Sequence, residues 1–350
     1  MKPRHAETAS GAPLDAHQRR IDYLRVSVTD RCNLRCVYCM PEEGIDLVPM
    51  DDVLTYEEIR EVVRVAASMG LRRVRLTGGE PLARKGLVDL VAMISGLPGI
   101  EEVALTTNGI ILARHAEALA KAGLARVNVS LDTLRPDRYR AITRGGRLED
   151  VLEGVEAAQE AGLTPVKLNV VVIPGLNDDE VIDLARSTLT NAWHVRFIEL
   201  MPFTALENAS QQPLFSGRRA PPSAAFVSNA SVRREIESAL GLLQPEEVDG
   251  NGPARYFRLP GAKGRIGFIS PLSEEGFCAR CNRMRLTATG KLRPCLLTDH
   301  EIDLMPSLRG GEGEEGIRRG ILAALATKPD SHHLRDGNRP RRRKMVQIGG

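Results

Sequence analysis

Short apolar runs rich in β-branched residues recur between residues 24 and 200, and their spacing is the strongest constraint on the fold. The runs are LRVSV, VRLTG, VALTT, RVNVSL, VKLNVVVI and VRFIEL, at 24–28, 74–78, 103–107, 126–131, 166–173 and 195–200. Stretches with helical periodicity separate them, at 55–69, 85–96, 112–122, 147–162 and 177–190. This alternation predicts a parallel sheet of βα units. Six strands are too few for a closed barrel of eight, so we expect an α/β fold, a partial (βα)6 open TIM-like barrel.

Conspicuous polar segments follow the predicted strands. CNLRCVYC comes after the first strand, GGEP after the second, TTNG after the third, and SLD ends the fourth. In a parallel barrel the active site lies where strands end and loops begin. The pattern therefore predicts an enzyme.

The remaining sequence suggests five regions. Residues 1–20 resemble a mobile leader without the apolar core of a signal peptide, and 21–203 form the barrel. Residues 204–230 are expected to be a loop or insertion, and 231–338 a C-terminal region that holds Cys278, Cys281 and Cys295. Residues 339–350 form a basic tail ending in Gly-Gly.

The bulk composition is that of an ordinary globular chain. Hydrophobic residues make up 42% and charged residues 27%, and the net charge of +3 is too small to argue for nucleic acid. No apolar run approaches the roughly 20 residues needed to span a bilayer. We therefore expect a cytoplasmic protein without a membrane or nucleic-acid partner.

Six cysteines form two groups of three: Cys32, Cys36 and Cys39, then Cys278, Cys281 and Cys295. A reducing compartment argues against disulfides, and metal or cluster binding explains all six better. In the first group, three thiolates can hold three irons of a cubane and leave the fourth open. A zinc loop is the alternative, but zinc usually takes four ligands, and no fourth lies nearby in sequence. Tyr38 and the GGEP segment favour the cluster.

The second group alone leaves zinc and cluster equally supported. CxxC is a common zinc half-site, and His300 could be a fourth ligand. Four arginines crowd around these cysteines: Arg280, Arg283, Arg285 and Arg293. Such cations suit an anionic substrate such as a nucleoside triphosphate, although a solvated basic surface is the alternative.

The first cysteine group and GGEP resemble the radical S-adenosylmethionine (SAM) superfamily, in which the GGE backbone contacts SAM. With the second group included, the chain is similar from about residue 20 to its end to the GTP 3′,8-cyclases of molybdenum cofactor biosynthesis. The resemblance rests on LRVSVTDRCNLRCVYCMP, RLTGGEPLAR, TTNG, VNVSLDTL, RFIELMP, FCARCNRMRLTATGKLRPCL and the terminal Gly349-Gly350. One departure is the long polar stretch that follows Met201-Pro202.

The resemblance implies SAM and two [4Fe–4S] clusters as cofactors, one cluster on each cysteine group. The residues implied for SAM are Tyr38, Gly79, Ser130 and Met201. Those implied for GTP are Arg25, Arg75, Thr106, Lys167, Arg283, Met284 and Arg285. Catalytic roles are implied for Arg283, Arg285, Gly349 and Gly350, with the glycine tail reaching into the active site.

The implied reaction is a lyase-type cyclisation of GTP. A deoxyadenosyl radical removes the ribose 3′-hydrogen, and the carbon radical attacks C8 of a guanine bound at the second cluster. The product is (8S)-3′,8-cyclo-7,8-dihydroguanosine 5′-triphosphate. The resemblance also implies a homodimer, an external electron donor, and cyclic pyranopterin monophosphate synthase as the enzyme that receives the product.

Two other functions compete with this interpretation. One is a two-cluster radical SAM enzyme that acts on a peptide, although such enzymes usually carry more C-terminal cysteines. The other is a zinc module that binds nucleic acid, which would contain about two zinc ions and no iron.

Overall fold

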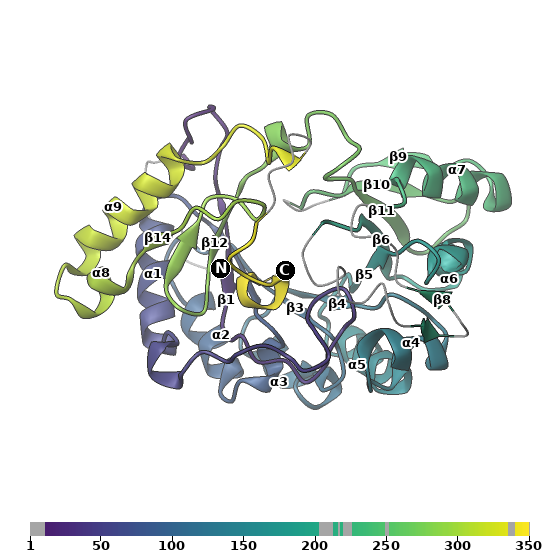
Figure 1. Cartoon of the computed structure of the whole chain (residues 1–350), viewed down its shortest axis with the longest axis horizontal. Helices are drawn as coiled ribbons and strands as arrows, with labels where there is room; N and C mark the ends of the chain where they lie inside the picture. The colour runs from purple at the N-terminus through teal and green to yellow at the C-terminus, as the bar shows by residue number, and fades with distance from the viewer. Residues whose placement is uncertain are drawn as a thin grey trace, which may run out of the picture.

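The computed structural model describes residues 11–202, 213–215, 218–219, 226–248, 252–334 and 340–349. Six parallel strands lie side by side in chain order and curve into an arc (Figure 1). They are β1 (Tyr23–Ser27), β2 (Arg73–Thr77), β3 (Glu102–Thr107), β4 (Arg126–Ser130), β5 (Lys167–Val172) and β6 (His194–Glu199). Each overlaps a predicted strand to within one or two residues at either end, so the partial open barrel is confirmed.

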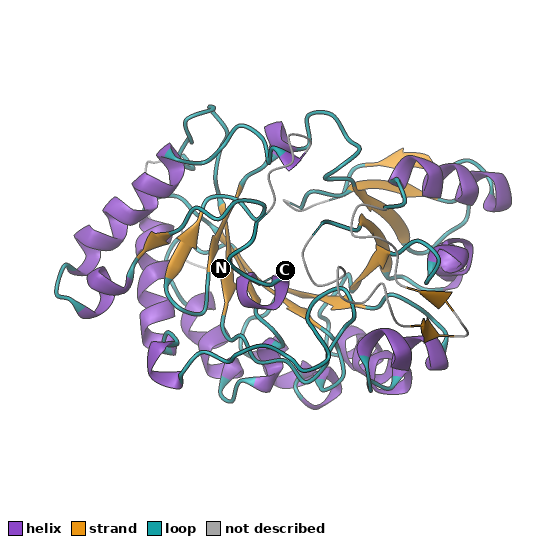
Figure 2. Ribbon diagram, in the orientation of Figure 1, coloured by secondary structure: helices purple, strands orange, loops and turns teal. Residues whose placement is uncertain are grey.

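Helices cover the outer side of this arc (Figure 2). They are α1 (Tyr56–Ser68), α2 (Leu87–Ser95), α3 (Ala116–Lys121), α4 (Pro136–Thr143), α5 (Leu148–Glu160) and α6 (Val181–Thr190). Five were predicted, and a capping box of Thr55 and Glu58 begins α1. The eight-residue α4 was missed because it is too short to show a clear period.

The C-terminal region extends the same sheet at both of its edges. Beside β6 lie β11 (Arg265–Ile269), β10 (Arg255–Arg258) and β9 (Gln244–Glu246). Beside β1 lie β12 (Arg283–Leu286), β13 (Lys291–Arg293) and β14 (Ile302–Asp303). Since β11 and β12 are consecutive strands at opposite edges, the chain between them crosses the open side of the barrel. That crossing segment carries Cys278 and Cys281.

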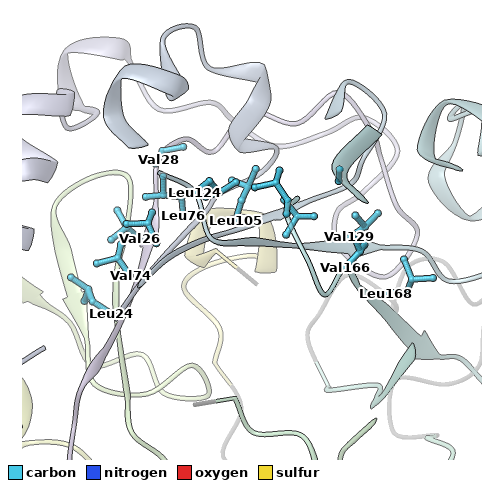
Figure 3. Close-up of a cluster of buried hydrophobic side chains, with 14 of the residues drawn as sticks. Leu24, Val26, Val28, Val74, Leu76, Leu105, Leu124, Val129, Val166 and Leu168 are labelled. Carbon is cyan, nitrogen blue, oxygen red and sulfur yellow. The ribbon is translucent and has the colours of Figure 1, made fainter. Parts of the chain in front are cut away.

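Strand alternation separates an apolar face from a polar one. Leu24 and Val26 of β1 pack with Val74 and Leu76 of β2 on the side of the sheet that carries the helices (Figure 3). Residues between them in sequence, such as Arg25, must point to the opposite, inner side. The inner side is therefore where the polar strand residues gather.

Four further helices complete the described chain: α7 (Asn229–Leu240), α8 (Met305–Arg309), α9 (Gly313–Ala326) and α10 (Met345–Ile348). The short α10 lies inside the arc, close to its centre (Figure 1). Most of the expected insertion at 204–230 lies outside the described residues, apart from the paired strands β7 (Pro213–Phe215) and β8 (Arg218–Arg219) and residues 226–230, the last two of which begin α7. In the described part of the chain, no helix has the length and apolarity to cross a membrane.

Residues 11–20 differ from the expected mobile leader, whereas residues 1–10 lie outside the described chain. Asp15 and Arg19 are both buried, and their side chains form an ion pair with Nε and Oδ2 2.6 Å apart. Arg19 also donates from Nη1 to the carbonyl of Cys278 at 3.0 Å. This segment is therefore fastened to the C-terminal region, a contact between distant residues that local composition does not reveal.

Candidate active site

A cavity of about 310 Å³ lies on the inner side of the sheet, and all six cysteines line it. Strand residues Arg25, Arg75, Thr106 and Ser130 form part of its wall, together with Gly79, Met201, Arg283 and Arg285. The fold thus brings two cysteine groups that are more than 200 residues apart in sequence to the same space. We call Cys32, Cys36 and Cys39 the first trio, and Cys278, Cys281 and Cys295 the second trio.

Strand register places three arginines side by side on one wall. Arg25 of β1 is paired in register with Arg75 of β2 on one side and with Arg285 of β12 on the other. Residues in register on neighbouring parallel strands point to the same face, so the three guanidinium groups lie in one row. Within the described chain, the Nε atoms of Arg75 and Arg285 are buried without a hydrogen-bond partner. Such a row is suited to a multiply charged anion.

Burial and mutual repulsion destabilise these cations in the protein alone. Burial, followed by the neighbouring Arg283, lowers the pKa of Arg285 to about 10. Burial and the nearby Arg285 also lower the pKa of Arg25. Burial, then Arg196, lowers the pKa of Lys167 to about 6. A bound anion would relieve this repulsion, which is the electrostatic signature of an anion site.

The first trio is buried beside the carboxyl groups of Asp132 and Glu80, and Arg35 donates from Nη1 to the carbonyl of Cys32 at 2.7 Å. Burial raises the pKa of Cys39 to about 12, and burial with the Cys39 thiol raises that of Cys36 well above its usual range. Tyr38, between these two cysteines, donates its hydroxyl to Oδ2 of Asp132 at 2.8 Å. Burial raises the pKa of Asp132 to about 6. The Asp132 contact fixes the position of the Tyr38 ring beside the trio.

Gly79 forms a close backbone contact with the loop that leads to the first trio. A Cβ at this position would clash with the carbonyl of Arg31, directly before Cys32. The next residue, Glu80, is buried and accepts hydrogen bonds from the Leu82 and Asn108 amides at 3.0 and 2.7 Å. The GGEP segment therefore packs against the cysteine loop and leaves its backbone at the cavity wall.

The second trio lies among cations instead. Burial acts to raise the pKa of Cys281, but Arg283 and Lys328 lower it overall to about 6. Arg283 Nη2 lies 4.0 Å from the Cys281 sulfur. Cys278 is in the short 3-10 helix η7 (Cys278–Arg280), on the segment that crosses the open side of the barrel. The thiolate form required of an iron ligand is thus stabilised at Cys281, whereas burial raises the pKa of Cys278.

The C-terminal tail enters the barrel as α10 and contacts both the arginine row and the first trio. Arg25 donates from Nη2 to the carbonyl of Gly349 at 3.1 Å, and the Val346 amide donates to the Cys39 thiol. Gly349 has a left-handed backbone with φ of 68°, and a Cβ there would lie 2.8 Å from Oγ1 of Thr77. Only glycine fits this position without strain. Gly350 lies outside the described residues.

Two residues implied for GTP do not line the cavity. Met284 points the other way from its neighbours Arg283 and Arg285 and is buried in the apolar core, because alternate strand residues face opposite sides. Lys167 is buried with its Nζ 5.5 Å from the centre of the Tyr256 ring. For Met284, the structure contradicts a side-chain contact with a ligand in the cavity.

Sequence reasoning also missed residues that line the cavity. Arg196 of β6 is buried in its wall, and Nε has no hydrogen-bond partner within the described chain. Its strand position, between the apolar Val195 and Phe197, is a signal that it shares with Arg25 and Arg75, which the family resemblance had implied. Lys328 and His332 line the cavity too, but they follow α9 in a segment without any recognisable pattern.

The donor sets fit iron–sulfur clusters better than zinc. Each trio supplies three thiols, whereas a structural zinc site usually takes four protein ligands. In a cubane, three thiolates bind three of the irons and leave the fourth iron open to another ligand. The cavity beside each trio has room for SAM and a substrate, and the Gly79 contact leaves backbone at its wall. The buried arginines supply positive charge for an anionic substrate.

The fold and this site define an enzyme of the radical SAM class. The Radical SAM superfamily model matches residues 26–188, and a model described as Molybdenum Cofactor Synthesis C matches residues 193–334. Streptococcus suis SuiB bound to S-adenosylmethionine has a similar fold, with a TM-score of 0.58 and 16% identity over 87% of this chain and 68% of SuiB.

More specific are the curated relatives. GTP 3′,8-cyclase of Pelotomaculum thermopropionicum is 54% identical over 96% of this chain and 99% of its own length. That of Heliobacterium modesticaldum is 53% identical over 96% of this chain and all of its own length. The chain belongs to the GTP 3′,8-cyclase family of radical SAM enzymes.

Proposed function

We propose that this protein is a radical SAM GTP 3′,8-cyclase that converts GTP to (8S)-3′,8-cyclo-7,8-dihydroguanosine 5′-triphosphate. This is the first step of molybdenum cofactor biosynthesis. The observation that carries the proposal is that one cavity contains both cysteine trios and the row of Arg25, Arg75 and Arg285. A cluster for SAM, a cluster for a base and a site for phosphates would then face one another.

In this proposal the first trio binds the cluster at which SAM is cleaved. Tyr38, Gly79, Ser130 and Met201 would contact SAM, and all four line the cavity. When bound, this cluster and SAM supply a 5′-deoxyadenosyl radical to the substrate. Gly79 would let the backbone approach the amino group of SAM, and Asp132 would hold Tyr38 in place.

The second trio would bind the cluster whose open iron receives the guanine base. Arg25, Arg75, Arg196, Arg283 and Arg285 would bind the triphosphate and hold the ribose between the two clusters. Thr106 lies on the same wall of the cavity. Lys167 does not line the cavity and would attract the triphosphate as a more distant positive charge. Their task is orientation, because the 3′-carbon and C8 must stay at bonding distance while water is excluded.

The tail contributes to the exclusion of water. Val346 and Ile348 are buried inside the barrel, so α10 fills space that solvent would otherwise occupy. Gly349 would lie beside the phosphates through its contact with Arg25. A side chain at Gly349 would reduce the space for substrate.

The proposal includes partners beyond GTP. An external donor must supply electrons, and cyclic pyranopterin monophosphate synthase would take up the product. A cytoplasmic homodimer is the expected form of the protein. Size-exclusion chromatography with light scattering tests the dimer directly.

The decisive experiment starts with anaerobic purification and analysis of iron, sulfide and zinc. We expect about eight irons per chain. Incubation with SAM, reductant and GTP should then yield 5′-deoxyadenosine and a cyclised guanine nucleotide, identified by mass spectrometry. A zinc protein without iron would support the nucleic-acid module instead. Iron with SAM cleavage that GTP does not affect would favour a peptide substrate.

A further inference from the structure

Lys328 is a buried cation beside the second trio, and the roles assigned above do not include it. It follows the end of α9 and is only 3% exposed. Burial of an ammonium costs several kcal/mol unless other groups compensate its charge. The groups that contact this ammonium therefore indicate what it does.

Two backbone carbonyls accept hydrogen bonds from Lys328. Its Nζ donates to the carbonyl of Arg283 at 2.7 Å and to that of Pro294 at 2.5 Å. Arg283 follows Cys281 by two residues, and Pro294 directly precedes Cys295. A single ammonium thus joins the two segments that carry these thiols, and one of its three N–H groups remains available.

The groups of opposite charge that face Lys328 are the thiols of Cys281 and Cys295. In the described chain, no carboxylate lies within ion-pair distance of its Nζ. Arg19 and Arg283 add positive charge nearby and oppose its protonation. The neutralising charge for this ammonium must come from the second trio or from what the trio binds.

A second cation, Arg19, also donates hydrogen bonds to backbone carbonyls at the second trio, but an ion pair neutralises its charge. Its Nη1 donates to the carbonyls of Cys278 and Asp330, at 3.0 and 2.9 Å. Its own charge is paired with Asp15. Arg19 therefore positions the Cys278 segment without adding net charge. Lys328 positions the segments of Cys281 and Cys295 and also adds positive charge.

We propose that Lys328 is a positioning residue for the second cluster and sets its reduction potential. The ammonium holds the Cys281 and Cys295 segments together and places next to the cluster a positive charge that no carboxylate of the described chain pairs with. Reduction adds negative charge to a cluster, so a nearby cation stabilises the reduced state and raises the potential. This inference rests on the proposed function only in assuming that the second trio binds a cluster.

The test uses the full-length chain with Cys32, Cys36 and Cys39 replaced by alanine, so that only the second cluster assembles. In this parent, Lys328→Gln removes the charge and keeps a hydrogen-bond donor, whereas Lys328→Arg keeps both. Lys121→Gln, an exposed lysine on α3, is the matched control. A redox titration monitored by electron paramagnetic resonance, with and without GTP, measures the midpoint potential.

We expect Lys328→Gln to shift the potential to a more negative value before GTP is added, while Lys328→Arg and Lys121→Gln remain near the parent. Loss of iron from Lys328→Gln but not from Lys328→Arg would equally support the inference. Equal midpoint potentials together with equal iron contents in the Gln and Arg variants would overturn it. A parent without iron would instead refute the second cluster, and so the proposed function itself.

Discussion

The two cysteine trios face one cavity but have different electrostatic surroundings. The first lies near Asp132, Glu80 and Arg35, and burial raises the pKa values of Cys32, Cys36 and Cys39. The second lies near Arg283 and Lys328, which lower the pKa of Cys281 to about 6, although burial raises the pKa of Cys278. The two trios thus supply the same three thiol ligands in two different electrostatic environments.

This difference matches the charges of the two molecules that the proposal brings to the trios. SAM carries a positive sulfonium, which a cation-rich wall would repel. GTP carries several negative charges, which the same wall would attract. The cysteine spacing sets where iron can bind, and the surrounding charge decides which ligand approaches each cluster.

The largest expected effect comes from removing one thiol from each trio. Cys36→Ala should abolish 5′-deoxyadenosine and cyclised product together, because SAM cleavage depends on the first cluster. Cys281→Ala should abolish the product while SAM cleavage remains detectable. Iron should fall from about eight to about four per chain in each variant. Unchanged GTP turnover in Cys281→Ala would show that the second trio has no separate role in the cyclisation.

Thiol reactivity of the iron-free chain should differ by roughly 100-fold between Cys281 of the second trio and Cys39 of the first trio at pH 7, since the thiolate is the reactive form. With a pKa of about 6, Cys281 is mostly thiolate at pH 7, and its rate should fall as the pH drops through 6. With a pKa of about 12, Cys39 should react more slowly, and its rate should keep rising up to that pH. Exchange with an aromatic disulfide, followed by peptide mass spectrometry, measures both.

Arg283→Met supplies the control for this experiment. It removes the cation that contributes most to lowering the pKa of Cys281 and should slow that thiol near pH 6 while leaving Cys39 unchanged. Equal rates for Cys281 and Cys39 in the wild-type chain would contradict the comparison.

Arg285→Met should weaken GTP binding by roughly 10- to 100-fold, because charge-assisted hydrogen bonds contribute about 1.5–3 kcal/mol each. SAM binding should change by less than about twofold, since the first trio lies elsewhere in the cavity. Arg280→Met is a suitable control, because Arg280 is next to Cys281 but is exposed and paired with Glu274. Calorimetric titration with GTP and with SAM measures whether the substitution affects the two affinities differently. Equal losses for both ligands would show that the arginine acts on the whole fold.

Two glycines give the smallest predicted effect. Gly79→Ala should lower the free energy of unfolding by about 1–3 kcal/mol and weaken SAM binding, because the Cβ clashes with the Arg31 carbonyl. Gly276→Ala, beside the second trio, has no atoms within 4 Å of its Cβ and a φ of +73°, so strain alone should cost about 1 kcal/mol. Denaturant unfolding measures both variants. A larger loss from Gly276→Ala would contradict this order.

Strands, helices and cysteine spacing were predictable because each depends on local patterns. Alternation of apolar runs predicted β1 to β6, whereas Arg25 and Arg75 were implied by the family resemblance. Both are polar residues inside such runs, and a search for that pattern in VRFIEL would have found Arg196. The side chain of Met284 faces the core for a local reason, since its neighbours Arg283 and Arg285 point the opposite way along one strand.

Contacts between distant segments could not be predicted in this way. Arg19 reaches Cys278, and Lys328 reaches Arg283 and Pro294, only because the chain crosses the open side of the barrel. The extension of the sheet at both edges depends on strand pairings that no short window of sequence contains. The arginines around the second trio are visible in the sequence. Their lowering of the Cys281 pKa could be inferred only from their positions in the structure.

The pairing of β1 with β12 has a consequence for synthesis of the chain. Tyr23 is in register with Arg283, so one side of the first strand has no partner until nearly the whole polypeptide has left the ribosome. A bare strand edge of this kind is a template for aggregation. Nascent fragments that stop before residue 283 should therefore depend on chaperones more than the finished protein does.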